Sequence, residues 1–75
     1  MTAPQIATTL RADILAGRIT PGEALQQEDL AARFGVSRIP VREALSRLEQ
    51  HGLITTERYK GAVVAGLSIE EIEEI

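Results

Sequence analysis

The chain lacks several residue types that metal sites and active sites need. It has no cysteine, no tryptophan and a single histidine, His51, among its 75 residues. Without cysteine there is neither a disulfide nor a thiolate ligand, and one imidazole cannot build a multi-histidine metal site. With no tryptophan to line a large pocket, a roomy ligand site or active site is not expected either. The sequence thus predicts no catalytic residue, no metal and no cofactor within these residues.

Long apolar runs are absent as well. No run approaches the roughly 18 residues of a membrane span, and the N-terminus lacks the charged-then-apolar pattern of a signal peptide. We therefore expect a cytoplasmic protein with no membrane contact. The length suffices for one small domain, which buries only roughly 60% of its unfolded surface and needs an economical core.

The net charge is negative, but the negative charge is concentrated at the end of the chain. The formal net charge is −3, and four glutamates in the last six residues carry −4 of it. Between Arg33 and Lys60 there are six cations and three anions, a balance of +3. Placement of charge matters more than its total when the partner is a phosphate backbone, so a nucleic-acid partner stays compatible with the composition. Ordinary scatter of charge over a solvated surface would give the same numbers.

Helix and turn signals follow one another in a regular order along the chain. Apolar residues recur at spacings of three and four, and glycines or a serine stand where helices should end or begin. Ser37 is the expected N-cap of the third helix, and Pro40 falls in that helix's first turn, where its missing N–H has no partner. We predict helices over residues 4–16, 27–34 and 38–50, and strands over residues 24–26, 53–57 and 62–65.

Residues 27–46, QEDLAARFGVSRIPVREALS, have the pattern of a helix-turn-helix. This motif needs a small residue where two helices approach, a glycine in the turn and apolar residues at the contacts between the helices. Ala31, Gly35 and Val41 meet these needs in order. The remaining inner positions are filled by Leu30, Phe34, Val36 and Ala44.

A predicted β-hairpin directly follows the third helix, and its tip carries Arg58, Tyr59 and Lys60. Gly61 suits the tip because glycine adopts positive φ without strain. Three helices followed by a hairpin form a winged helix-turn-helix. We therefore predict a mainly α fold with a small two- to three-stranded antiparallel wing, in which the third helix and the wing grip a DNA duplex at two points.

The residues expected to contact DNA lie at the start of the third helix. Arg38 and Arg42 are four residues apart, so they project together from one edge of the helix, near the end that probes base edges in this motif. Arginine binds guanine O6 and N7 with two parallel hydrogen bonds, and it also clamps phosphates. Ser37 can offer a hydroxyl or a backbone N–H to a phosphate. The alternative for Arg42 is a local salt bridge with Glu49.

Other polar residues have less specific interpretations. Arg47 lies on the opposite side of the third helix, where it is solvated or paired with Glu43. Arg33 reaches either a phosphate or the C-terminus of its own helix. His51 is a capping or surface histidine. Tyr59 packs under the wing or stacks on the sugar-phosphate backbone, and the sequence favours neither.

The sequence resembles the GntR family of bacterial transcription regulators at SRIPVREALSRLEQHGLI. The match extends through ILAGRITPGEAL, LAARFGVSRIPVREAL and LITTERYKGAVVA, nearly the whole chain, and LSIEEIEEI looks like the family's FadR-type branch. The resemblance implies a metabolite-responsive regulator that binds palindromic operators as a homodimer. It places the recognition helix in the major groove and the wing, at about 54–65, at the minor groove. It also implies an all-helical effector domain, absent here, that dimerises and binds a small molecule.

Carried over by position, Ser37, Arg38, Pro40 and Arg42 match the family's contact segment, and Gly61 matches its wing-tip glycine. Two positions depart from the pattern. Ile39 stands where threonine is usual, which replaces a hydroxyl contact by an apolar one, such as to a thymine methyl. Glu28 stands where some members place a DNA-contacting arginine, and that contact is not carried over. The predicted DNA-binding residues are Ser37, Arg38, Ile39, Pro40, Arg42, Arg58, Lys60 and Gly61.

The last residues predict the start of a further helix. Ser68 and Glu71 form a capping box, with isoleucines at every third position behind it. We expect a DNA-binding domain over residues 1–66 and, over 67–75, a linker and helix leading to the absent domain. The chain alone is then expected to be a weakly binding monomer. Two alternatives are a winged helix that binds protein and the DNA-binding head of an aminotransferase-like regulator.

Overall fold

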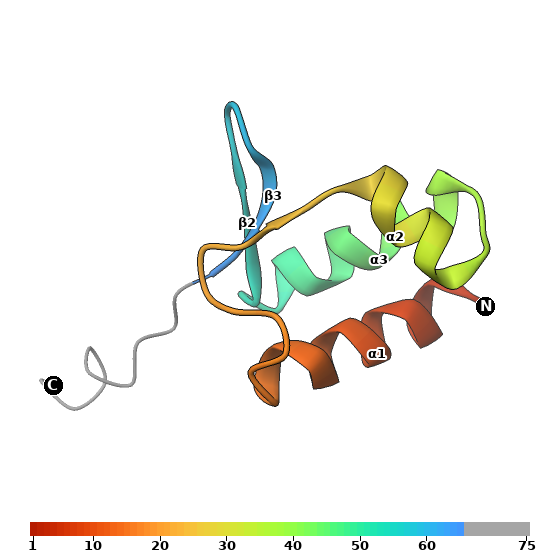
Figure 1. The fold of residues 1–75 in the computed structure, drawn as a ribbon, viewed down its shortest axis with the longest axis horizontal. Helices are drawn as coiled ribbons and strands as arrows, with labels where there is room; N and C mark the ends of the chain where they lie inside the picture. The colour runs from red at the N-terminus through yellow and green to blue at the C-terminus, as the bar shows by residue number, and fades with distance from the viewer. Residues whose placement is uncertain (66–75) are drawn as a thin grey trace, which may run out of the picture.

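The computed structural model describes residues 1–65 and holds three helices and three strands over that range (Figure 1). The predicted elements are confirmed to within two residues at each end, and residues 67–75, with their predicted helix, lie outside the described range. None of the described helices has the length and apolar character needed to cross a membrane. The elements are α1 (Ala3–Leu15), β1 (Ala24–Leu25), α2 (Gln27–Phe34), α3 (Arg38–Gln50), β2 (Ile54–Glu57) and β3 (Gly61–Val64).

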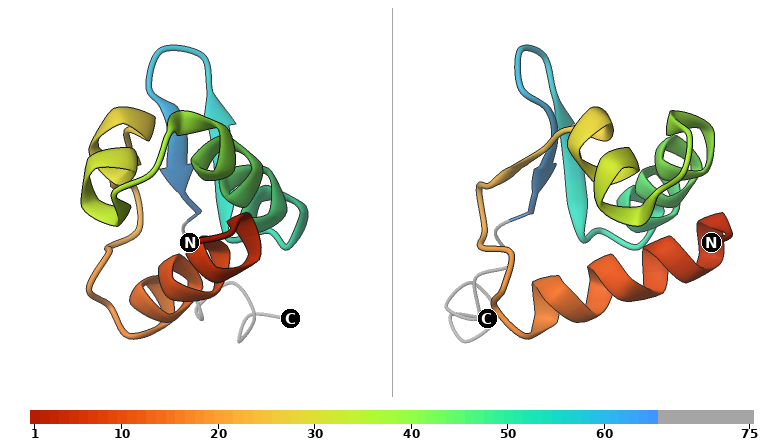
Figure 2. Two further views of the ribbon diagram at one scale, coloured as in Figure 1. Left: turned by 90° about the vertical axis from the view of Figure 1, so that its right-hand side faces the viewer. Right: turned by 45° about the vertical axis from the view of Figure 1, so that its right-hand side comes forward.

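Helix α1 begins at a capping box that the sequence reading missed. The Thr2 hydroxyl accepts a hydrogen bond from the Gln5 backbone N–H, and the Gln5 side chain accepts one from the Thr2 backbone N–H at 2.8 Å. These two bonds satisfy donors that every helix N-terminus leaves unpaired. Ile6 and Leu10 are fully buried and fix α1 along α3, on the side of the molecule away from the wing (Figures 1 and 2).

The turn between α2 and α3 has the predicted geometry. Gly35 ends α2 in the left-handed region at φ 67°, and the Val36 backbone N–H donates to the Ala31 carbonyl at 3.0 Å. Ala31 and Val41 are buried where the two helices meet. Ser37 occupies the N-cap position of α3, but its side chain makes no capping hydrogen bond there, which differs from the expected cap.

The three strands form an antiparallel sheet in the order β1–β3–β2. The central strand β3 pairs with β2 from Ile54↔Val64 to Glu57↔Gly61, and with the two-residue β1 through its middle residues Ala62 and Val63. Only the β2–β3 hairpin extends beyond the helices, so it projects as a narrow wing (Figures 1 and 2). Ile54 and Val64 are buried against the helices and anchor the base of that wing in the core.

Candidate nucleic-acid interface

The N-terminal half of α3 presents an exposed edge opposite its buried one. Val41, Ala44 and Leu45 face the core, whereas Arg38 and Arg42 are exposed and lie one helical turn apart. Ile39 is 78% exposed beside them. Pro40 is half-buried in the first turn. The structure thus exposes Arg38, Ile39 and Arg42 on the solvent-facing side of α3.

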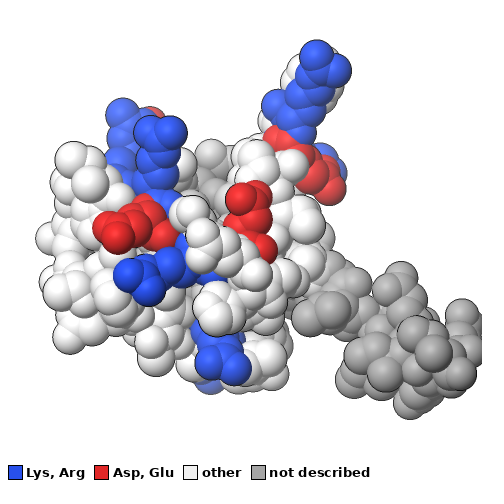
Figure 3. Space-filling model, turned by 180° about the vertical axis from the view of Figure 1, so that it is seen from behind, with Lys and Arg blue, Asp and Glu red and all other residues white. Residues whose placement is uncertain are grey.

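The wing tip is a second exposed basic point. Arg58, Tyr59 and Lys60 form the turn between β2 and β3 and are all exposed, and Gly61 adopts φ 74° beside them. Tyr59 is 92% exposed, so the interpretation that it packs under the wing is wrong. In Figure 3 the Lys and Arg side chains project from the hairpin end and, across a saddle, from the helical part on the same side of the molecule.

Two surface hollows connect these points. One lies between the start of α2, Arg38 and the wing residues Lys60 and Gly61. The other lies between α3 and the wing, with Arg42, Ser46 and Thr56 in its walls. Sequence reasoning missed Ser46, although its position four residues beyond Arg42 puts it on the same helix edge. The two hollows share Gln27, Gly61 and Ala62 in their walls, so they adjoin between the helices and the wing.

Arg38 is paired with an acid on the neighbouring helix. Its Nη1 lies 3.3 Å from Oε1 of Glu28, in the first turn of α2. Both side chains are mainly exposed, at 63% and 81%. From the sequence, Glu28 indicated only the loss of a family contact, because nothing in the pattern of the nine intervening residues shows that the turn brings the two side chains together.

Arg42 remains exposed, and the alternative that it pairs with Glu49 is wrong. The Glu49 carboxylate instead accepts a hydrogen bond from the Thr56 hydroxyl on β2. No ion pair of Arg42 occurs within residues 1–65. Glu49 therefore ties strand β2 of the wing to α3 and leaves the Arg42 guanidinium at the surface.

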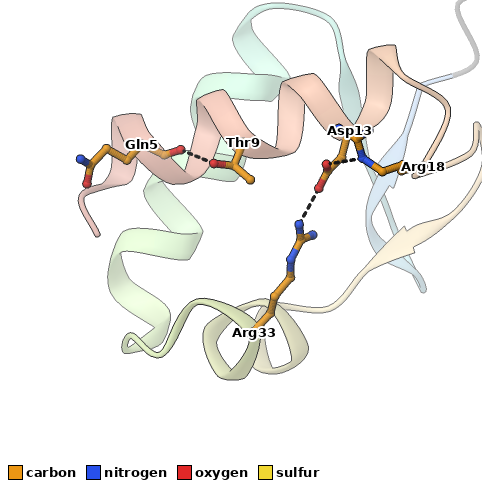
Figure 4. A network of polar contacts seen from close by, with 5 residues as sticks. All are labelled: Gln5, Thr9, Asp13, Arg18 and Arg33. Atoms are coloured by element: carbon orange, nitrogen blue, oxygen red, sulfur yellow. Dashed lines mark hydrogen bonds and ion pairs between the residues drawn. The ribbon is translucent and has the colours of Figure 1, made fainter.

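Arg33 has a structural partner that neither sequence interpretation foresaw. Its Nη2 lies 2.7 Å from Oδ2 of Asp13 on α1, while Nε of Arg18 lies 2.9 Å from Oδ1 of the same carboxylate (Figure 4). The Arg33 guanidinium also lies 4.9 Å from the centre of the Phe34 ring. The hydrogen bond from Arg33 lowers the pKa of Asp13 most, and the hydrogen bond from Arg18 lowers it further. Together they hold this pKa below its ordinary value of 3.8, although burial acts in the opposite direction. Arg33 is thus occupied in joining α2 to α1.

The opposite side of α3 holds the remaining basic residues. Arg47 and His51 line a shallow hollow with Arg11 of α1, away from the wing. Arg47 makes no ion pair with Glu43 within the described residues, so its solvated interpretation is the one that fits. His51 is the exposed C-cap residue of α3, as predicted. Arg47 therefore offers a control for the two arginines on the other edge.

Comparisons with known proteins agree with this geometry. The model of the family described as bacterial regulatory proteins, gntR family, matches residues 2–64. The gluconate operon transcriptional repressor of Bacillus licheniformis is 47% identical over 74 residues, which cover 99% of this chain and 30% of that protein. The chain therefore spans about a third of the length of the curated relatives it matches.

Solved structures show the same fold. A GntR-family regulator from Pseudomonas syringae pv. tomato superposes with a TM-score of 0.86 at 47% identity, over 96% of this chain and 30% of that one. The AraR DNA-binding domain in complex with operator ORX1 superposes with a TM-score of 0.76 at 30% identity, over 84% of this chain and 77% of that one. The chain therefore belongs to the GntR family of bacterial regulatory proteins, as a DNA-binding domain of the winged helix-turn-helix type.

Proposed function

We propose that this domain binds a specific operator sequence with α3 in the major groove and the wing tip at the adjacent minor groove. The observation that carries the proposal is the placement of two exposed arginines on one edge of α3 and a basic wing tip on the same side of the molecule. A major groove about 12 Å wide admits one helix, and a projecting hairpin then reaches the neighbouring backbone or minor groove.

Each residue of the α3 surface has a chemical role in this arrangement. Arg38 and Arg42 read guanine by two parallel hydrogen bonds, or fix the register by clamping phosphate. The Ser37 hydroxyl makes no capping bond, so it remains available to a phosphate oxygen. Ile39 packs on a thymine methyl, which its exposure supports. Pro40 shapes the first turn that presents these side chains.

The wing acts mainly through charge and backbone. Arg58 and Lys60 neutralise phosphates, while Gly61 lets the turn approach the duplex because it has no side chain. Tyr59, exposed at the same tip, stacks on the sugar-phosphate backbone. These contacts add affinity that depends strongly on salt but carries little sequence information.

The protein to which this domain belongs is proposed to be a cytoplasmic, metabolite-responsive repressor of the FadR-type branch. Relatives named as transcriptional repressors support the direction of regulation. In this proposal residues 1–66 are the DNA-binding domain, a further domain binds the small-molecule effector and forms the homodimer, and two copies read a palindromic operator. The domain alone would then be a monomer that binds a half-site weakly.

The test is the effect of single arginine substitutions on binding to a duplex selected from a random pool. Arg38→Ala and Arg42→Ala are each expected to weaken binding by about 5- to 150-fold, which corresponds to about 1–3 kcal/mol. Arg47→Ala, on the other edge of the same helix, is the matched control and should change binding little. Fluorescence anisotropy titrations at two salt concentrations measure this. Equal binding by the wild type and both edge variants would refute the proposed interface.

A further inference from the structure

The ion pair between Glu28 and Arg38 lies within the proposed DNA interface. The two residues come from the first turns of α2 and α3, and their side chains meet at 3.3 Å across the turn that joins the helices. They form one wall of a hollow whose other wall contains Lys60 and Gly61 of the wing. An acid at this place is unfavourable for a surface that binds only phosphate, so its position needs another explanation.

Stability does not supply that explanation. Exposed ion pairs contribute little to folding, because water screens the charges and two long side chains must be ordered. Both partners are more than half exposed here. The pair therefore influences which groups Arg38 can bind more than it influences folding stability.

The geometry of the pair leaves Arg38 able to bind a base. Only Nη1 contacts Glu28, while the edge formed by Nε and Nη2 makes no hydrogen bond within residues 1–65. That edge offers two parallel donors of the kind that guanine O6 and N7 accept. A phosphate bound there would place a second anion close to the Glu28 carboxylate, and the two anions would repel each other.

We propose that Glu28 is a specificity-determining residue, which suppresses phosphate binding by Arg38 while permitting its contact with guanine. This inference rests on the proposed function, because it assumes that Arg38 faces DNA. It makes Glu28 a positioning residue that acts through Arg38 and lowers affinity for DNA of the wrong sequence. Repulsive elements of this kind are a general route to specificity.

The proposal predicts how Glu28→Gln changes binding to two duplexes. On a random duplex, the released Arg38 gains a phosphate, so affinity should rise about three- to tenfold and the salt slope should steepen by about one. On a duplex selected by the wild-type chain, Arg38 already contacts guanine, so affinity should change less than about twofold. The ratio of the two affinities should therefore fall about three- to tenfold.

Asp29→Asn is the matched control for this experiment. Asp29 is the next residue of the same helical turn, is exposed, and makes no ion pair within residues 1–65. The substitution removes the same charge without touching Arg38, so it should raise both affinities slightly and leave their ratio unchanged. Anisotropy titrations of the 75-residue chain and both variants, on both duplexes and at several salt concentrations, give the ratios and slopes.

The possible outcomes distinguish a failure of the proposed role of Glu28 from a failure of the proposed function. A lowered ratio with a steeper random-duplex slope in Glu28→Gln, and neither in Asp29→Asn, supports the role of Glu28. An unchanged ratio in Glu28→Gln overturns it, as does a loss of affinity for the selected duplex alone, since Glu28 would then read a base itself. Failure of the proposed function has another signature, in which the wild type does not discriminate between the duplexes or Arg38→Ala binds both as the wild type does.

Discussion

Of the polar contacts within residues 1–65, those of Asp13 should contribute most to the stability of the fold. It is the only charged side chain buried within residues 1–65, at 6% exposure, and it holds arginines from two separate segments. The bond to Arg18 is local, whereas the bond to Arg33 joins α1 to α2 across twenty residues of chain. Asp13→Ala removes both hydrogen bonds and leaves the two guanidinium groups without their common partner.

The magnitude follows from the exposure of the partners. A hydrogen bond to a charged group contributes about 1.5–3 kcal/mol, but Arg18 and Arg33 are 64% and 47% exposed and regain water when the carboxylate is lost. Each bond is therefore taken near its lower limit, and the better helix propensity of alanine offsets about 0.5 kcal/mol. We expect Asp13→Ala to lower the free energy of unfolding by about 2.5 kcal/mol. The melting temperature should then fall by about 10–20 °C, at about 4–8 °C per kcal/mol for a domain of this size.

Urea and thermal unfolding followed by circular dichroism measure the effect. Glu43→Gln, at an exposed α3 residue without an ion pair in the described range, is the control and should change stability by less than about 0.5 kcal/mol. In a double-mutant cycle with Arg33→Ala, the two substitutions together should destabilise the fold by less than the sum of their separate effects, because each removes the same bond. A destabilisation below about 0.5 kcal/mol, or no coupling, would refute the view that this carboxylate joins the helices.

Four further predictions follow from the same contacts. The pKa of Asp13 is lower in the folded state than its ordinary value of 3.8. The stability that the ionised carboxylate contributes is therefore present above about pH 4 and is lost as the pH falls through the folded-state pKa. In urea titrations across pH 2–6, Asp13→Asn should lack this part of the acid dependence. Val41→Ala, at a fully buried site between α2 and α3, should lower the free energy of unfolding by about 2 kcal/mol, and a loss near zero would show that the helices close the cavity. Gly61→Ala places a side chain at φ 74° and should lower the melting temperature by several degrees through about 1 kcal/mol of strain, unless the wing turn changes conformation. Thr56→Val removes the hydrogen bond to Glu49. It should speed amide hydrogen exchange in β2 and β3, while the free energy of unfolding changes by less than about 1 kcal/mol. Unchanged exchange would contradict the anchoring role of Glu49.

The sequence predicted what depends on local periodicity and turn chemistry. The α2 helix, its end at Gly35 and the buried Val41 all follow from patterns within a window of about twenty residues, and the structure confirms them. The partners of the charged side chains did not follow. Arg33 contacts Asp13 and Arg38 contacts Glu28 because the chain folds back, and Tyr59 is exposed because its hairpin extends beyond the core. Such contacts depend on tertiary geometry, which residue types and spacing do not encode locally.

The acidic side chains near the interface explain how a chain of net charge −3 can still present a basic surface. Asp13 lies on the α1 side and holds Arg18 and Arg33, so the charges of that cluster remain far from the wing. Glu49 is held by Thr56 on strand β2 of the wing, which leaves Arg42 unpaired among the described residues. Within residues 1–65, Glu28 is the one acid that forms an ion pair with a cation of the proposed interface, and both side chains of that pair are mainly exposed. Because salt at physiological concentration screens interactions between exposed charges beyond about 8–10 Å, a duplex at this surface responds to these nearby groups rather than to the total charge.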